Sequence, residues 1–171
     1  MMWPSLCRLR LALPLLGLVA ALCNPVAHAG PFEIAISPSR FELSGRNTQR
    51  IGQSMDIQNL GGTATEVSVR TIDWTYSPEG HITYHDALLP GSCRPWVTLE
   101  RKLVRVPARG KAAFRFQVDV PVDAQRGECR FMLAVEGVEP AHKALIESGG
   151  ASLSLPVNGR IAVAVYMALN G

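Results

Sequence analysis

The chain has 171 residues, of which 47% are hydrophobic and 18% are charged, and its formal net charge is +3 at pH 7. This length suits one domain with a substantial hydrophobic core. The near balance of basic and acidic residues excludes a strongly basic surface of the kind that binds nucleic acid.

The first 29 residues have the pattern of a secretory signal peptide. A basic start is followed by an apolar run over residues 11–22 and by Ala27-His28-Ala29, whose small residues flank the expected cleavage site. A transmembrane anchor is the alternative, but the run is too short for one and contains Pro14. We therefore predict a signal peptide over residues 1–29 and an exported domain over residues 30–171, without stable insertion in a membrane.

Beyond this segment, apolar and polar residues alternate with a period of two, which is typical of half-buried β-strands. The segments expected as strands are, in chain order, 32–36, 40–43, 51–57, 67–74, 81–84, 96–99, 103–107, 114–120, 131–135, 152–155 and 160–169. Turn residues separate them, and no convincing helical period occurs after the signal. With the interrupted segments 32–36 and 40–43 counted as one strand and the shortest segments left out, we expect seven or eight strands. Such a number indicates an all-β fold, an immunoglobulin-like β-sandwich in a single domain.

Two places depart from the pattern of a regular strand. The first strand is broken by Ser37-Pro38-Ser39, and because proline cannot donate a hydrogen bond to a neighbouring strand, we expect it at the edge of a sheet. Further along, the apolar residues of 67–69 and of 72–74 lie on opposite faces. This change of face predicts a β-bulge near Thr71.

Cys93 and Cys129 are the two cysteines that remain once the signal peptide is removed. Exported proteins form disulfides readily, so a bond between these two is the simplest interpretation. Cys129 also shares the inward parity of Phe131 and Leu133. A redox role is the alternative, but the two cysteines lack the C-x-x-C spacing that such a role favours.

Few residues are candidates for catalysis or metal binding. His81 and His85 are four residues apart and lie on one face of an expected strand, where they could hold a metal, but no third ligand is evident. Exposed histidines of a hairpin are the alternative, and we prefer it. Asp73 and Glu79 form no persuasive carboxylate pair, and no motif of a hydrolase, a zinc protease or a phosphate-binding loop occurs. We therefore predict no enzymatic activity, no metal site and no cofactor.

The last expected strand is apolar on both faces, with no charge or proline between residues 161 and 169. An edge strand of this composition is either covered or kept for a partner, since strand addition uses main-chain hydrogen bonds for affinity and alternate side chains for fit. The alternatives are that the row packs the core of this domain or forms a homodimer. The alternating apolar row comprises Ile161, Val163, Val165, Met167 and Leu169.

Four segments resemble the first domain of the periplasmic pilus-assembly chaperones, the PapD-like superfamily. They are residues 36–43 with their arginine, residues 55–59, the proline-and-glycine turn in 104–111 and the strand 130–136. Together they extend over most of residues 34–169. The resemblance implies an immunoglobulin-like sandwich, a periplasmic location and the binding of pilin-like or other exported subunits by β-strand donation.

In that family, an arginine of the first strand and a lysine of the last strand anchor the terminal carboxylate of a subunit. Arg40 matches the arginine, whereas Ala162 stands at the position of the lysine and Arg160 is the nearest basic residue. The resemblance therefore implies a subunit-binding role for Arg40, for Arg160 and for the apolar row of the last strand. On its sequence alone, Arg40 fits either a carboxylate-binding residue or a solvated strand residue.

A different class of function competes with this one. An immunoglobulin-like binding module of the cell envelope, which contacts peptidoglycan or a surface protein through its loops, would show the same strand pattern and would also lack the second domain of the chaperones. The leading hypothesis is the chaperone-like domain, because four separate segments support it.

Overall fold

The computed structural model describes residues 32–138, 142–148, 151–157 and 159–171. The predicted signal peptide lies outside these ranges. Within them, no helix is both long enough and apolar enough to cross a membrane.

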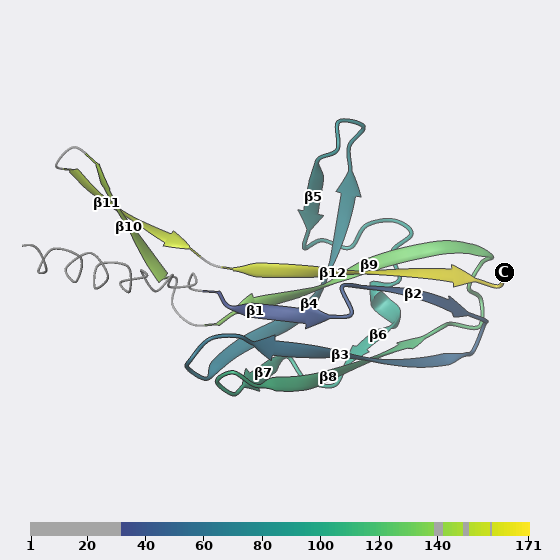
Figure 1. Ribbon diagram of the computed structural model, residues 1–171. Helices are drawn as coiled ribbons and strands as arrows, with labels where there is room; N and C mark the ends of the chain where they lie inside the picture. Colours follow the sequence, from purple (N-terminus) through teal and green to yellow (C-terminus); the bar gives the residue numbers. More distant parts are fainter. Residues whose placement is uncertain (1–31, 139–141, 149–150, 158) are drawn as a thin grey trace, which may run out of the picture.

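The chain folds into two β-sheets that pack face to face (Figure 1). The four-stranded sheet has the order β1 (Ile34–Ser37), β3 (Arg50–Asn59), β8 (Lys111–Asp119) and β6 (Val97–Leu99). The six-stranded sheet has the order β2 (Arg40–Gly45), β12 (Arg160–Leu169), β9 (Gly127–Gly137), β4 (Thr65–Tyr76) and β5 (Ile82–His85), and β7 (Leu103–Val106) also pairs with β4. β10 (His142–Ser148) and β11 (Ala151–Val157) form a separate hairpin, and a single 3₁₀ turn, η2, covers Arg94–Trp96.

This architecture confirms the predicted all-β sandwich. The described residues contain twelve strands rather than seven or eight. Part of the difference arises because the first strand is split at Pro38 into two strands that join different sheets, and part because residues 142–148 pair with the short strand expected at 152–155. The expected edge position is also confirmed, since β1 ends the four-stranded sheet and β2 ends the six-stranded one.

The main core lies between the two sheets, where alternate residues of every long strand point inward. Three phenylalanines mark its centre: the ring of Phe116 stands edge-on to Phe41 at 5.2 Å and to Phe131 at 6.3 Å. Edge-to-face pairs of this kind add to the stabilisation from burial alone. Trp96 packs against this core from the η2 turn.

The predicted β-bulge near Thr71 is wrong. The pairing of β4 with β9 keeps one register from Val67 opposite Gly137 to Ile72 opposite Met132. The apolar residues change face because the six-stranded sheet is covered on both sides. A second, smaller cluster on its outer face contains Ile72, Met132 and Ala134, with Trp74, Ala162 and Ala164 packed against it.

The two cysteines that the sequence pairs are joined in the structure. Cys93, just before η2, is bonded to Cys129 of β9, with the two Cα atoms 5.7 Å apart, and both side chains are buried. The bond ties the segment that leads into β6 to the centre of the six-stranded sheet.

We predict that replacing both Cys93 and Cys129 with alanine lowers the free energy of unfolding by up to about 4 kcal/mol, because the bond closes a long loop in the unfolded chain. Urea unfolding of oxidised wild type and of the double variant measures the difference. Alkylation without reduction, followed by mass spectrometry, provides the control. Two labelled thiols in the wild-type protein would contradict the bond.

Candidate functional site

The terminal strand β12 lies inside the six-stranded sheet over most of its length. It pairs with β9 throughout, from Arg160 opposite Glu136 to Leu169 opposite Gly127, and with β2 only from Ala164 onward. The expectation of an edge strand is therefore wrong for its second half. Over Arg160–Val163, no described strand pairs on the side away from β9, and we call these four residues the open edge.

The large side chains of β12 fill the domain's own core. The exposed fractions are 1% for Val163, 0% for Val165, 1% for Met167 and 5% for Leu169, and Ile161 is partly buried against the same core. The row therefore packs against this domain's own core, which is one of the alternatives that the sequence leaves open, and its role in subunit binding stays a prediction. The row is buried because β12 has a neighbouring strand on each side over its second half, so its inward side chains form part of the core.

The open edge faces the side of the sandwich where the first strand crosses between sheets. β1 pairs only with β3 of the other sheet, and β2 joins β12 two residues after Pro38. At the far end, Phe32 packs against Gly159, where an added Cβ would lie 2.0 Å from the phenylalanine ring. Glycine is required there by this close approach.

Arg40 stands where the open edge ends. It is the first residue of β2 and lies opposite Ala164, next to Val163 along β12. Its side chain is 68% exposed and pairs with Glu42 at 2.8 Å. An exposed pair of this kind contributes little to stability, so the guanidinium is available to a ligand.

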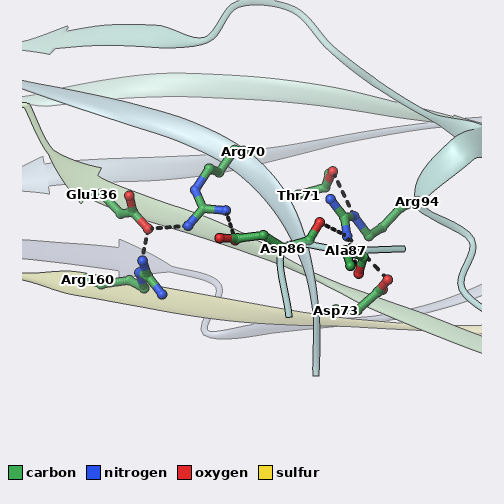
Figure 2. Close-up of polar contacts among 8 residues, drawn as sticks. All are labelled: Arg70, Thr71, Asp73, Asp86, Ala87, Arg94, Glu136 and Arg160. Carbon is green, nitrogen blue, oxygen red and sulfur yellow. Dashed lines mark hydrogen bonds and ion pairs between the residues drawn. The ribbon is translucent and has the colours of Figure 1, made fainter. Parts of the chain in front are cut away.

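Arg160 stands at the other end of the open edge, in a network of charges on the outer face of the sheet (Figure 2). The Glu136 carboxylate forms an ion pair with Arg160 and accepts a hydrogen bond from Arg70 at 3.0 Å. Arg70 also donates to Asp86, which raises the pKa of the guanidinium and lowers the pKa of the carboxyl. Arg160 is therefore already paired within the domain, whereas a side chain that binds an external anion would be unpaired in the free protein.

A second polar cluster, also drawn in Figure 2, was missed by the sequence analysis. Asp73 is 3% exposed and accepts hydrogen bonds from the Leu89 amide at 2.9 Å, the Ser92 hydroxyl at 2.7 Å and Arg94 at 3.3 Å. Arg94 also donates to the carbonyls of residues 86 and 87 and to a threonine hydroxyl. An aspartate between the apolar residues Ile72 and Trp74 was the available signal, and it marks the anchor of the segment 86–94.

A groove of about 930 Å³ opens on the outer face of the six-stranded sheet beside Arg40. Tyr166, Met167 and Ala168 of β12 form part of its lining, together with residues of β2, β9 and the turn at 90–91. Arg130 of β9 shares this groove with Arg40. The groove thus extends from the end of the open edge toward the β4–β5 hairpin.

The two histidines do not come together as a pair of ligands. His85 makes a hydrogen bond with Thr75, with 2.9 Å between its Nε2 and the threonine Oγ1, while His81 is exposed in the turn. Across the described ranges, no three histidine, cysteine or acidic side chains gather as metal ligands would.

We predict that Val163→Thr and Val165→Thr each lower the free energy of unfolding by about 1–3 kcal/mol, because each places a hydroxyl in the main core without an assured partner. Ala168→Thr, on the exposed face of the same strand, is the matched control. Chemical unfolding curves measure all three. Near-wild-type stability of both valine variants would contradict the position of this row in the core.

We predict that Asp73→Asn lowers the free energy of unfolding by about 3 kcal/mol, because the half-buried guanidinium of Arg94 loses the buried carboxylate that is its countercharge. Glu79→Gln, at an exposed turn, should change it by less than about 0.5 kcal/mol. Thermal or urea unfolding compares the two variants. Equal stability of both would show that the Asp73 cluster does not anchor the segment 86–94.

The comparisons with known proteins bear on the fold. No protein-family model and no curated protein matches the sequence. Among solved structures, the chain is similar to the Salmonella enterica complex of the SafA pilin with the SafB chaperone, with a TM-score of 0.53 and 14% identity over 84% of this chain and 58% of that chain. It is also similar to the E. coli chaperone DraB, with a TM-score of 0.52 and 11% identity over 81% of this chain and 56% of that one.

A third structure, of a chaperone–tip adhesin complex in CFA/I fimbriae biogenesis, has a TM-score of 0.52 and 10% identity over 79% of this chain and 55% of that one. The chain thus spans a little over half the length of each of these proteins. At such identities the likeness concerns the fold. The domain has the fold of PapD-like fimbrial chaperones.

Proposed function

We propose that this chain is a chaperone-like domain of the periplasm that binds pilin-like or other exported protein subunits at the open edge of β12. The observation that carries the proposal is that β2 stops short of Arg160–Val163, and that Arg40 stands where the free main chain ends. The fold shared with fimbrial chaperones supports this, as does the predicted signal peptide.

The direction of β2 indicates how a subunit would bind. β2 runs parallel to β12 and begins at Arg40. A partner segment that pairs in parallel with Arg160–Val163 therefore lies in line with β2, and its carboxyl end meets the Arg40 guanidinium. Guanidinium groups bind carboxylates through two parallel hydrogen bonds, so a terminal carboxylate is the ligand that fits. The main chain supplies the affinity and Arg40 fixes the register.

This proposal changes the form of strand donation that the sequence suggests. The domain offers main-chain groups of four residues, about 13 Å of strand, rather than the side chains of the buried row. Ile161, which is only partly buried, is the large side chain of the open edge that can contact a partner. Arg160 borders the site as a paired charge.

We predict that Arg40→Ala weakens subunit binding by about 10- to 100-fold, the loss expected for a charged hydrogen bond, while the free energy of unfolding changes by less than about 0.5 kcal/mol. Arg105→Ala, an exposed arginine on β7, is the matched control and should leave both unchanged. A pull-down from periplasm measures capture, and thermal melting measures stability.

Two results would contradict the proposal. If Arg40→Ala unfolds the domain while the remaining folded protein binds normally, the residue is structural. If wild type captures glycan or envelope proteins instead of pilin-like subunits in equal ratio, the domain is an envelope-binding module of the competing class.

A further inference from the structure

All three tyrosines of the chain lie on one side of the molecule. Tyr76 and Tyr84 belong to the β4–β5 hairpin, which projects from the sandwich in Figure 1, and their exposed fractions are 61% and 44%. The register places Trp74 opposite Tyr84 and Tyr76 opposite Ile82, so these four residues share one face of the hairpin. We call Trp74, Tyr76, Ile82 and Tyr84 the hairpin face.

The hairpin face is continuous with the outer face of the six-stranded sheet. The Arg130 guanidinium lies 4.2 Å from the centre of a Trp74 ring, and Tyr166 of β12 meets Trp74 edge-on at 6.2 Å. Tyr166 is itself 39% exposed. Tryptophan, tyrosine and arginine dominate the binding energy of protein interfaces, and an exposed cluster of them marks an interaction surface.

The chemistry of the surroundings favours a protein as the occupant. β5 pairs only with β4 among the described strands, and its four residues include neither lysine nor proline to block further pairing. A sugar would need free polar side chains beside the rings. Several of the neighbouring ones are engaged within the domain: Thr75 with His85, and Asp73 with Ser92 and Arg94.

The hairpin face also lies close to the proposed site of subunit binding. Arg130 and the turn at residues 90–91 line both the groove that contains Arg40 and a second hollow of about 340 Å³ that contains Trp74. Ala164, opposite Arg40, is two residues and about 7 Å from Tyr166 along β12. A folded domain of 100 residues has a radius of gyration of about 13 Å, so a subunit held at Arg40 is large enough to reach the hairpin face.

We propose that the hairpin face is a second docking surface for the same exported subunit whose end is held at Arg40. This inference rests on the proposed function. The body of the subunit packs against Tyr76, Ile82 and Tyr84, while its terminal segment pairs with the open edge. Two separated contacts select a folded subunit over any unfolded chain with a free carboxyl end.

The test compares three proteins in complex with one pilin-like subunit that the periplasmic pull-down recovers in equal ratio. In the first variant, Tyr76→Thr, Ile82→Thr and Tyr84→Thr keep β propensity and remove the apolar face. In the control, Leu103→Thr and Val122→Thr replace apolar residues of comparable exposure, at 51% and 74%, that lie outside the hairpin.

We expect the hairpin variant to bind the subunit at least about tenfold more weakly, with an unchanged melting temperature, and the control to bind as wild type does. Hydrogen–deuterium exchange should show that residues 76–85 gain protection in the wild-type complex. Arg40→Ala and the hairpin variant report on the two contacts separately.

Four results would overturn this inference. A hairpin variant that binds as tightly as wild type contradicts the second docking surface but not the proposed function. Failure of wild type to capture any subunit contradicts both the second docking surface and the proposed function. A wild-type dimer that the hairpin variant abolishes shows that the face belongs to a second copy of this chain. Co-sedimentation of wild type with peptidoglycan, lost in the hairpin variant, shows that the face binds glycan.

Discussion

The crossing of the first strand between the two sheets is the constraint on which the candidate site depends. β1 pairs with β3 in one sheet, and after Pro38 the chain pairs with β12 in the other. Because β2 can begin only after this crossing, it cannot reach the first four residues of β12. The crossing of the first strand therefore leaves the main chain of Arg160–Val163 free on one side. It also places Arg40 at the end of this free stretch.

The outer face of the six-stranded sheet depends on a second constraint, the attachment of the segment 86–94. The bond between Cys93 and Cys129 and the contacts of Asp73 hold this segment on the sheet. On the outer face of the same sheet, Ile72 and its neighbours form a second cluster, and β4 continues beyond the sandwich to pair with β5. Asp73 and Trp74 are neighbours in β4 and point to opposite faces of the sheet. Asp73 thus holds the segment 86–94 on one side of β4, while Trp74 belongs to the hairpin face on the other.

The sequence predicts where most strands lie but not which strands are neighbours in a sheet. Alternation located β3, β8 and β12, and Pro38 correctly marked an edge. The change of parity after Thr71 predicts a bulge that the structure does not contain, because hydrophobicity indicates that a side chain is buried and not which layer buries it. The interior position of β12 and the place of Arg40 at the end of a gap depend on pairings between residues more than 100 positions apart, which no local pattern contains.

The burial of the row in β12 does not conflict with a partner at the open edge. In a strand, side chains stand roughly perpendicular to the sheet, whereas main-chain hydrogen bonds lie within it. Val163 can therefore fill the core while the main chain of the same strand stays free on the side away from β9. Substitutions in this row therefore act on stability, because the side chains fill the core while the main chain is what pairs with a partner. Arg40 and the hairpin face lie outside the core, and only there can binding be separated from folding.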